Sequence, residues 1–130
     1  MVPNEYKEIM IKVNIEKSDE ALRMVEVSIK EHAPFTALNR IYYAIFYTVT
    51  ALAEKHEFRT SKHSNMMGWF NKKFIHEDKV FDGELLQTYQ DAFKFRQKGD
   101  YDSRYIASID IVEELLPRAK EFIQKVKTVI

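Results

Sequence analysis

The feature that most constrains the fold is an unbroken apolar and aromatic segment from Ile41 to Ala53, which reads Ile-Tyr-Tyr-Ala-Ile-Phe-Tyr-Thr-Val-Thr-Ala-Leu-Ala. On a helix these residues cover every side, and a helix that is apolar all round has to be surrounded by protein or lipid. The segment is shorter than the roughly 20 residues that span a bilayer. We therefore expect a central helix, from about Phe35 to Lys55, packed inside a helical bundle, and no association with a membrane.

The rest of the chain also has the pattern of amphipathic helices. Three Gly and three Pro among 130 residues are too few for the many turns of a β-sandwich. Apolar residues spaced three or four apart predict further helices, which lie at residues 4–31, 62–75, 84–98 and, after an N-cap at Ser108, along the C-terminal segment. The length suits one domain, so we expect an all-α bundle of four to five helices over residues 1–130.

Three local features refine this expectation. On the first helix, the stripe predicted to face the core includes Tyr6 and Met24. Gly99 is predicted to end the fourth helix as a left-handed C-cap, a conformation that glycine adopts without steric cost. Pro117 lacks an N–H and is predicted to kink or split the last helix.

Charge is balanced overall but uneven along the chain. Twenty Lys and Arg residues match twenty Asp and Glu residues, so the whole molecule is not a general binder of polyanions. The segment from Lys55 to His76 nevertheless contains five Lys or Arg residues and one Glu, a local charge of +4. Any anionic ligand is therefore expected near the middle of the chain, and the alternative is that this segment is a solvated basic loop.

Cys, His and the N-terminal residues indicate a simple cytoplasmic protein. The absence of Cys excludes disulfides and fits a reducing cytoplasm. Residues 1–6 lack a basic segment followed by an apolar run, so no signal peptide is expected. The four His residues do not have the spacing of metal ligands, so we expect no metal site and no cofactor.

Two residues stand out by their helical positions. Arg96 continues the apolar stripe of Leu85 and Tyr89, so its guanidinium faces protein, and a buried cation needs a partner. That partner is either an internal acid such as Asp100 or an anionic ligand, because the planar guanidinium suits carboxylates and phosphates alike. His63 lies in the first turn of its helix, where free N–H groups favour an anion. The alternative for His63 is an ordinary surface residue.

Four segments resemble, in the same order, the sequence elements of the HEPN domain family. They are Asn39-Arg40-Ile41-Tyr42-Tyr43-Ala44-Ile45-Phe46, similar to the (S/N)-R-x-Y-Y-A-x-F core helix; His63 with Phe70 and Phe74, similar to the T-H helix start and its aromatics; Arg96-Gln97-Lys98-Gly99-Asp100-Tyr101, similar to R-x-x-(A/G)-D-Y; and Ala119-Lys120-Glu121-Phe122-Ile123, similar to A-x-x-F-(I/V). No single element is specific, but their combination and order favour the family.

The resemblance implies an up-and-down bundle that forms a homodimer through its long helices. Many relatives act beside a minimal nucleotidyltransferase as a toxin–antitoxin pair. Others are metal-independent ribonucleases, in which an Arg and a His a few residues further on, from two subunits, cleave RNA. Arg96 occupies the position of that Arg, but no His occurs from Gln97 to Ser103.

Three functions therefore remain open. In the first, the protein is a homodimeric partner of a nucleotidyltransferase, with a cleft for a nucleotide or RNA phosphate. The residues expected there are Arg96, His63, Arg40, Lys62, Asp100 and Tyr101, of which Tyr101 stacks beside the ligand or accepts a nucleotidyl group from the partner. In the second, the protein is a metal-independent ribonuclease in which Arg96 holds the scissile phosphate and His63 is the acid–base. In the third, it is a purely structural module whose Arg96–Asp100 contact closes a helix end.

Overall fold

The computed structural model describes residues 3–130, which form five α-helices and one π-helix and contain no strand. Residues 1–2, the start of the stretch in which no signal peptide is expected, lie outside the described residues. The elements are α1 (Asn4–Lys30), α2 (Pro34–Lys55), α3 (His63–Phe70), the π-helix η1 (Asn71–Glu77), α4 (Gly83–Tyr101) and α5 (Ile109–Lys127). The expected all-α bundle is confirmed, with the helix expected over residues 62–75 built as α3 followed directly by η1. Within residues 3–130, no helix is long and apolar enough to cross a bilayer, and no three potential metal ligands form a group.

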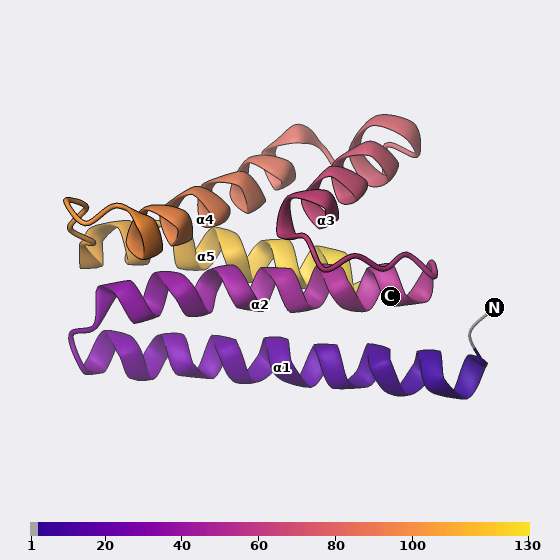
Figure 1. Ribbon diagram of the computed structural model, residues 1–130, viewed down its shortest axis with the longest axis horizontal. Coiled ribbons are helices and arrows are strands. Elements are labelled where there is room, and N and C mark those ends of the chain that lie inside the picture. Colours follow the sequence, from indigo (N-terminus) through magenta and orange to yellow (C-terminus); the bar gives the residue numbers. More distant parts are fainter. Residues whose placement is uncertain (1–2) are drawn as a thin grey trace.

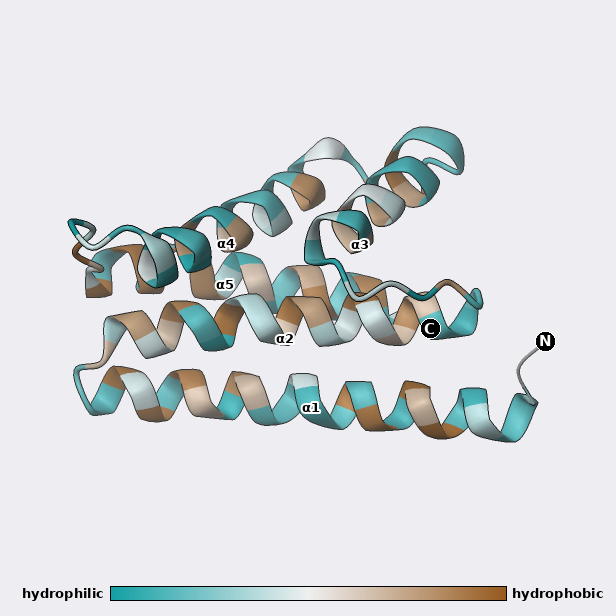
Figure 2. Ribbon diagram, in the orientation of Figure 1, coloured by the Kyte–Doolittle hydropathy of each residue, from teal (hydrophilic) through white to brown (hydrophobic). Residues whose placement is uncertain are grey.

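The α2 helix is the centre of the bundle. It contacts α1, α3, α4 and α5, with α1 along one side and α4 and α5 along the other (Figure 1). Hydropathy colouring shows polar residues along much of α1 and apolar residues along α2 (Figure 2). Most of the segment from Ile41 to Ala53 is fully buried. One face remains half-buried, and it carries Tyr43, Phe46, Tyr47 and Thr50. The central position of this helix is as predicted, except that this one face is partly open.

The face that α1 buries differs from the prediction. Tyr6 and Met24, which were expected in the core, are 46% and 42% exposed, whereas Ser18 is fully buried. The Ser18 hydroxyl donates to the carbonyl oxygen of Ala44 at 2.8 Å and lies 2.7 Å from the Thr48 hydroxyl of α2. Small polar side chains can be buried when their hydrogen bonds are satisfied. The predicted stripe is thus correct in part, because Ala21 and Ser28 of that stripe are buried, and it is wrong at Tyr6 and Met24.

Gly99 does not end α4, and Pro117 does not split α5 into two helices. Gly99 is not in the left-handed region but lies inside α4, which continues to Tyr101. A Cβ atom at Gly99 would meet the Phe35 ring at 3.1 Å, so this glycine permits the first turn of α2 to approach α4. Pro117 lies within one continuous α5. Both Pro117 and Glu113, whose carbonyl loses its usual backbone donor, are exposed, so water can satisfy that carbonyl.

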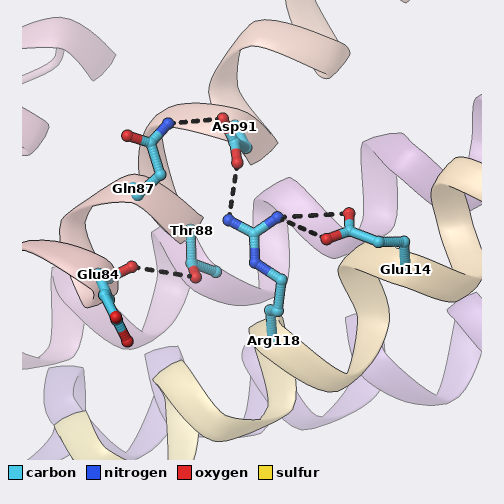
Figure 3. Close-up of polar contacts among 6 residues, drawn as sticks. All are labelled: Glu84, Gln87, Thr88, Asp91, Glu114 and Arg118. Carbon is cyan, nitrogen blue, oxygen red and sulfur yellow. Dashed lines mark hydrogen bonds and ion pairs between the residues drawn. The ribbon is translucent and has the colours of Figure 1, made fainter.

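Arg118 of α5 ties α4 to α5. Its Nη2 donates to Asp91 Oδ2 at 2.7 Å and its Nη1 donates to Glu114 Oε1 at 3.0 Å (Figure 3). Gln87 donates to the other oxygen of Asp91 at 2.8 Å. Burial raises the pKa of Asp91, but the hydrogen bonds from Arg118 and Gln87 outweigh it and hold that pKa below its ordinary value. These contacts anchor α4, the helix that carries Arg96.

Candidate functional site

Two adjacent tyrosines on α2 form the base of the candidate site. Tyr42 is fully buried and Tyr43 is half-buried. Arg96 reaches both from α4: its guanidinium carbon lies 5.3 Å from the centre of the Tyr42 ring and 5.5 Å from that of the Tyr43 ring. Both distances are in the range of cation–π attraction. Only 15% of the Arg96 side chain is exposed, which confirms that this cation faces protein.

His63, the first residue of α3, contacts the same Tyr42. The Tyr42 hydroxyl lies 2.7 Å from His63 Nδ1, and the imidazole stacks on Phe46 with 4.2 Å between the ring centres. Burial lowers the pKa of His63 below its ordinary value, and the charge of Arg96 lowers it further. His63 is therefore neutral at neutral pH. If Nδ1 accepts the Tyr42 hydroxyl hydrogen, Nε2 carries the imidazole hydrogen and is the donor.

Arg40 approaches the Tyr43 ring as well. Its guanidinium carbon lies 5.1 Å from the ring centre. Its Nε and Nη2 donate to Asn39 Oδ1 at 3.1 and 2.8 Å, and it makes no ion pair with an acid among residues 3–130. Two guanidinium groups, from Arg40 and Arg96, therefore lie within 5.5 Å of the centre of one tyrosine ring.

Asp100 partly balances this positive charge. Its Oδ2 lies 3.0 Å from Arg96 Nε, but the N–H does not point at the oxygen, so Nε is buried without an aligned hydrogen bond. The internal ion pair considered from the sequence is therefore present. It lies within α4 and does not close the end of the helix, which comes at Tyr101. With His63 neutral, the two arginines exceed the one carboxylate by one positive charge.

Tyr101 and Lys62 do not join these groups. Tyr101 is 76% exposed, and its side chain makes no hydrogen bond or aromatic contact with another of residues 3–130. Lys62 is exposed at the N-cap position of α3. The structure thus brings Arg96, His63, Arg40 and Asp100 together around two tyrosine rings and leaves the other two predicted residues in solvent. We refer to Arg40, Tyr42, Tyr43, His63 and Arg96 as the arginine–tyrosine site.

From the sequence alone, no functional role was predicted for Tyr42, Tyr43, Phe46 or Asn39. All four lie in the segment that resembles the HEPN core helix, where a residue can either belong to a site or simply pack in the core. The spacing from Asn39 to Tyr43 and from Tyr43 to Phe46 places three of them on one helical face. The sequence therefore shows that these residues share a face, but it does not show which other helix covers that face.

One family model and two known proteins are similar to this chain. The family model described as "HEPN domain" matches residues 11–129. A Methanocaldococcus jannaschii protein named "Putative toxin MJ0142" is 34% identical over 113 residues, which cover 87% of this chain and 76% of that protein. A Thermotoga maritima protein named "UPF0332 protein" is 32% identical over 124 residues, which cover 95% of this chain and 93% of that protein.

Proposed function

This chain belongs to the HEPN domain family, and on that premise we propose that it is a toxin-type HEPN protein whose arginine–tyrosine site binds a phosphate of RNA or of a nucleotide. We further propose that it acts as a homodimer and pairs with a minimal nucleotidyltransferase. The toxin part draws on the name of the relative from Methanocaldococcus jannaschii. The nucleotidyltransferase partner draws on the resemblance of the four sequence elements.

The observation that carries the phosphate site is the pair of guanidinium groups on the Tyr43 ring. Two like charges near one ring repel each other, and one carboxylate, Asp100, does not neutralise both. A phosphate does, because its oxygens accept from several N–H groups of planar guanidinium forks at once.

The surface of α1 supports the homodimer. Of the elements in the bundle, α1 packs mainly against α2 (Figure 1). Its outer side carries apolar residues between 42% and 54% exposed, which are Tyr6, Ile9, Met24 and Val27. These residues form two pairs near the two ends of α1, Tyr6 with Ile9 and Met24 with Val27, and exposed apolar patches of this kind mark contact surfaces. Sedimentation equilibrium of the purified chain tests the dimer.

RNA binding is tested by fluorescence anisotropy with a labelled single-stranded oligonucleotide over a range of salt concentrations. Arg40→Gln and Arg96→Gln are each expected to weaken binding and to reduce the salt slope by about 0.7 for each phosphate that the variant no longer neutralises. Arg23→Gln is the matched control, because Arg23 is exposed on α1 and distant in sequence from the site. Equal affinities for all three variants would contradict the proposed site.

A metal-independent ribonuclease is the second candidate, and His63 is the observation that favours it. A neutral imidazole held by Tyr42 can accept a proton, as a general base does. Cleavage of RNA in EDTA that stops in both His63→Ala and Arg96→Gln would establish this activity. If Arg96→Gln changes only the melting temperature, the structural role of the Arg96–Asp100 pair accounts for the residue.

Partnership has its own test. Co-expression with the nucleotidyltransferase from an adjacent reading frame is expected to give a complex that survives gel filtration. Separate elution of the two proteins at micromolar concentration would argue against the pairing while leaving the phosphate site untouched.

A further inference from the structure

A small pocket adjoins the arginine–tyrosine site, between the first turns of α2 and the last turns of α4. Its volume is about 120 Å³, and its lining residues are Phe35, Leu38, Asn39, Phe95, Arg96, Gly99 and Asp100. We propose that this space, the Phe35 pocket, holds the base of a nucleotide whose phosphate is bound by Arg40 and Arg96. The inference rests on the proposed function and adds a second subsite to it.

The shape of the Phe35 pocket suits a flat ring. Phe35 is 45% exposed, and Tyr105 packs edge-on against it with 6.0 Å between the ring centres. One edge of the Phe35 ring lies against Gly99, where a Cβ atom would be only 3.1 Å from it, so a ligand ring can use only the exposed part of Phe35. A volume of about 120 Å³ is room for one ring and not for a whole nucleotide. Bases bind to such surfaces by stacking on the aromatic side chain.

The pocket is continuous with the phosphate site through two of its residues. Arg96 lines the pocket while its guanidinium lies on the Tyr42 and Tyr43 rings. Asn39 also lines the pocket, and its Oδ1 accepts from Arg40 Nη2 at 2.8 Å. A nucleotide with its phosphate at the two arginines therefore has its base beside the Phe35 ring.

Asp100 gives the pocket a preference among bases. Its Oδ2 lies 3.0 Å from Arg96 Nε, and its Oδ1 accepts no side-chain hydrogen bond from another of residues 3–130. A carboxylate only accepts hydrogen bonds. Cytosine presents an N4 amino donor where uracil presents an O4 acceptor. An amino group against Asp100 forms a hydrogen bond, whereas a carbonyl there would set two acceptors against each other, so the best ligand is an amino-bearing pyrimidine.

The test uses NMR titration of the full chain with CMP, UMP and ribose 5-phosphate, which carries the phosphate and sugar without a base. Gly99→Ala is the main variant, because the added methyl group would meet the Phe35 ring at 3.1 Å and displace it, while it improves the helix propensity of α4. Gly68→Ala is the matched control, since it also lies in a helix and its Cβ would meet nothing within 4 Å. Phe35→Leu is a second variant that removes the aromatic surface and keeps an apolar side chain.

For the wild type, CMP is expected to bind about tenfold more tightly than ribose 5-phosphate, with UMP between them. Gly99→Ala and Phe35→Leu should reduce the CMP affinity to that of ribose 5-phosphate, and Gly68→Ala should change neither. Equal affinities of CMP and ribose 5-phosphate for the wild type would overturn the base pocket and leave the phosphate site standing. Tighter binding of UMP than of CMP would overturn the role of Asp100. Failure of every ligand to bind would overturn the phosphate site, and the pocket with it.

Discussion

Two buried tyrosines, Tyr42 and Tyr89, are predicted to respond in opposite ways to replacement by phenylalanine: one variant loses stability and the other gains it. Tyr89 and Tyr42 are both fully buried. The Tyr89 hydroxyl has no hydrogen-bond partner among residues 3–130, and its ring packs between Phe70 and Phe122. The Tyr42 hydroxyl contacts His63 Nδ1 at 2.7 Å. Tyr89→Phe therefore removes a desolvated group that gains nothing in the folded state, whereas Tyr42→Phe removes a formed hydrogen bond.

The magnitudes follow from the cost of burial and the net value of a hydrogen bond. An unsatisfied buried polar group costs about 1–3 kcal/mol, so Tyr89→Phe is expected to stabilise the protein by about 1–2 kcal/mol after partial relaxation of the site. A formed hydrogen bond contributes about 0.5–1.5 kcal/mol, so Tyr42→Phe is expected to destabilise it by about 1 kcal/mol. For a chain of this length each kcal/mol corresponds to a shift of about 4 °C in melting temperature.

Thermal and urea unfolding, followed by circular dichroism, measure both changes on one scale. Tyr89→Phe should melt about 4–8 °C above the wild type and Tyr42→Phe about 4 °C below it. A Tyr89→Phe variant that is destabilised as much as Tyr42→Phe would refute the reasoning, because the Tyr89 hydroxyl would then have a partner, such as a buried water.

Three further predictions concern stability and protonation. Asp91→Asn should lower the free energy of unfolding at pH 7 by about 0.5–1 kcal/mol. Because the pKa of Asp91 in the folded protein lies below its ordinary value, this difference in stability should persist above about pH 4 and vanish as the pH falls through the folded pKa. Urea unfolding at several pH values would measure it. Pro117→Ala should stabilise the protein by up to about 3 kcal/mol, since the helix is already continuous and gains an N–H donor; an unchanged urea midpoint would contradict this. Arg96→Gln should raise the pKa of His63 by removing a nearby positive charge, and an unchanged NMR titration midpoint of the imidazole would count against their proximity.

The central helix could be predicted because its signal is local. A run that is apolar on every side, from Ile41 to Ala53, determines that other helices surround it. The buried face of α1 could not be predicted in the same way. Ser18 is buried because a carbonyl and a hydroxyl on α2 satisfy it, and nothing in the sequence near Ser18 reports those partners. The role of Gly99 could not be predicted either, because a glycine is needed there only to leave room for the Phe35 ring of another helix.

In the candidate site, too, features set by one helix could be predicted, whereas contacts between helices could not. The inward direction of Arg96 follows from its helical stripe, and the position of His63 follows from a helix start. Their common contact with Tyr42 joins three helices and depends on how α3 and α4 are placed on α2, which periodicity does not determine. Tyr101 was expected beside them because it is close to Arg96 in sequence. Five positions along a helix turn it to another side, where it is exposed.

The most direct test of the account is the pKa of His63 with and without a bound nucleic acid. NMR titration of the imidazole would be carried out on the free protein and on its complex with a 2′-O-methyl oligonucleotide, which has no nucleophilic hydroxyl and is not cleaved by 2′-OH attack. Burial lowers the pKa of His63, and the charge of Arg96 lowers it further. A phosphate between Arg40 and Arg96 offsets that charge, so the account predicts that binding raises the pKa of His63 while the ring signals of the exposed His32 stay unchanged. A complex in which His63 titrates as it does in the free protein would contradict the claim that the arginine–tyrosine site holds the phosphate.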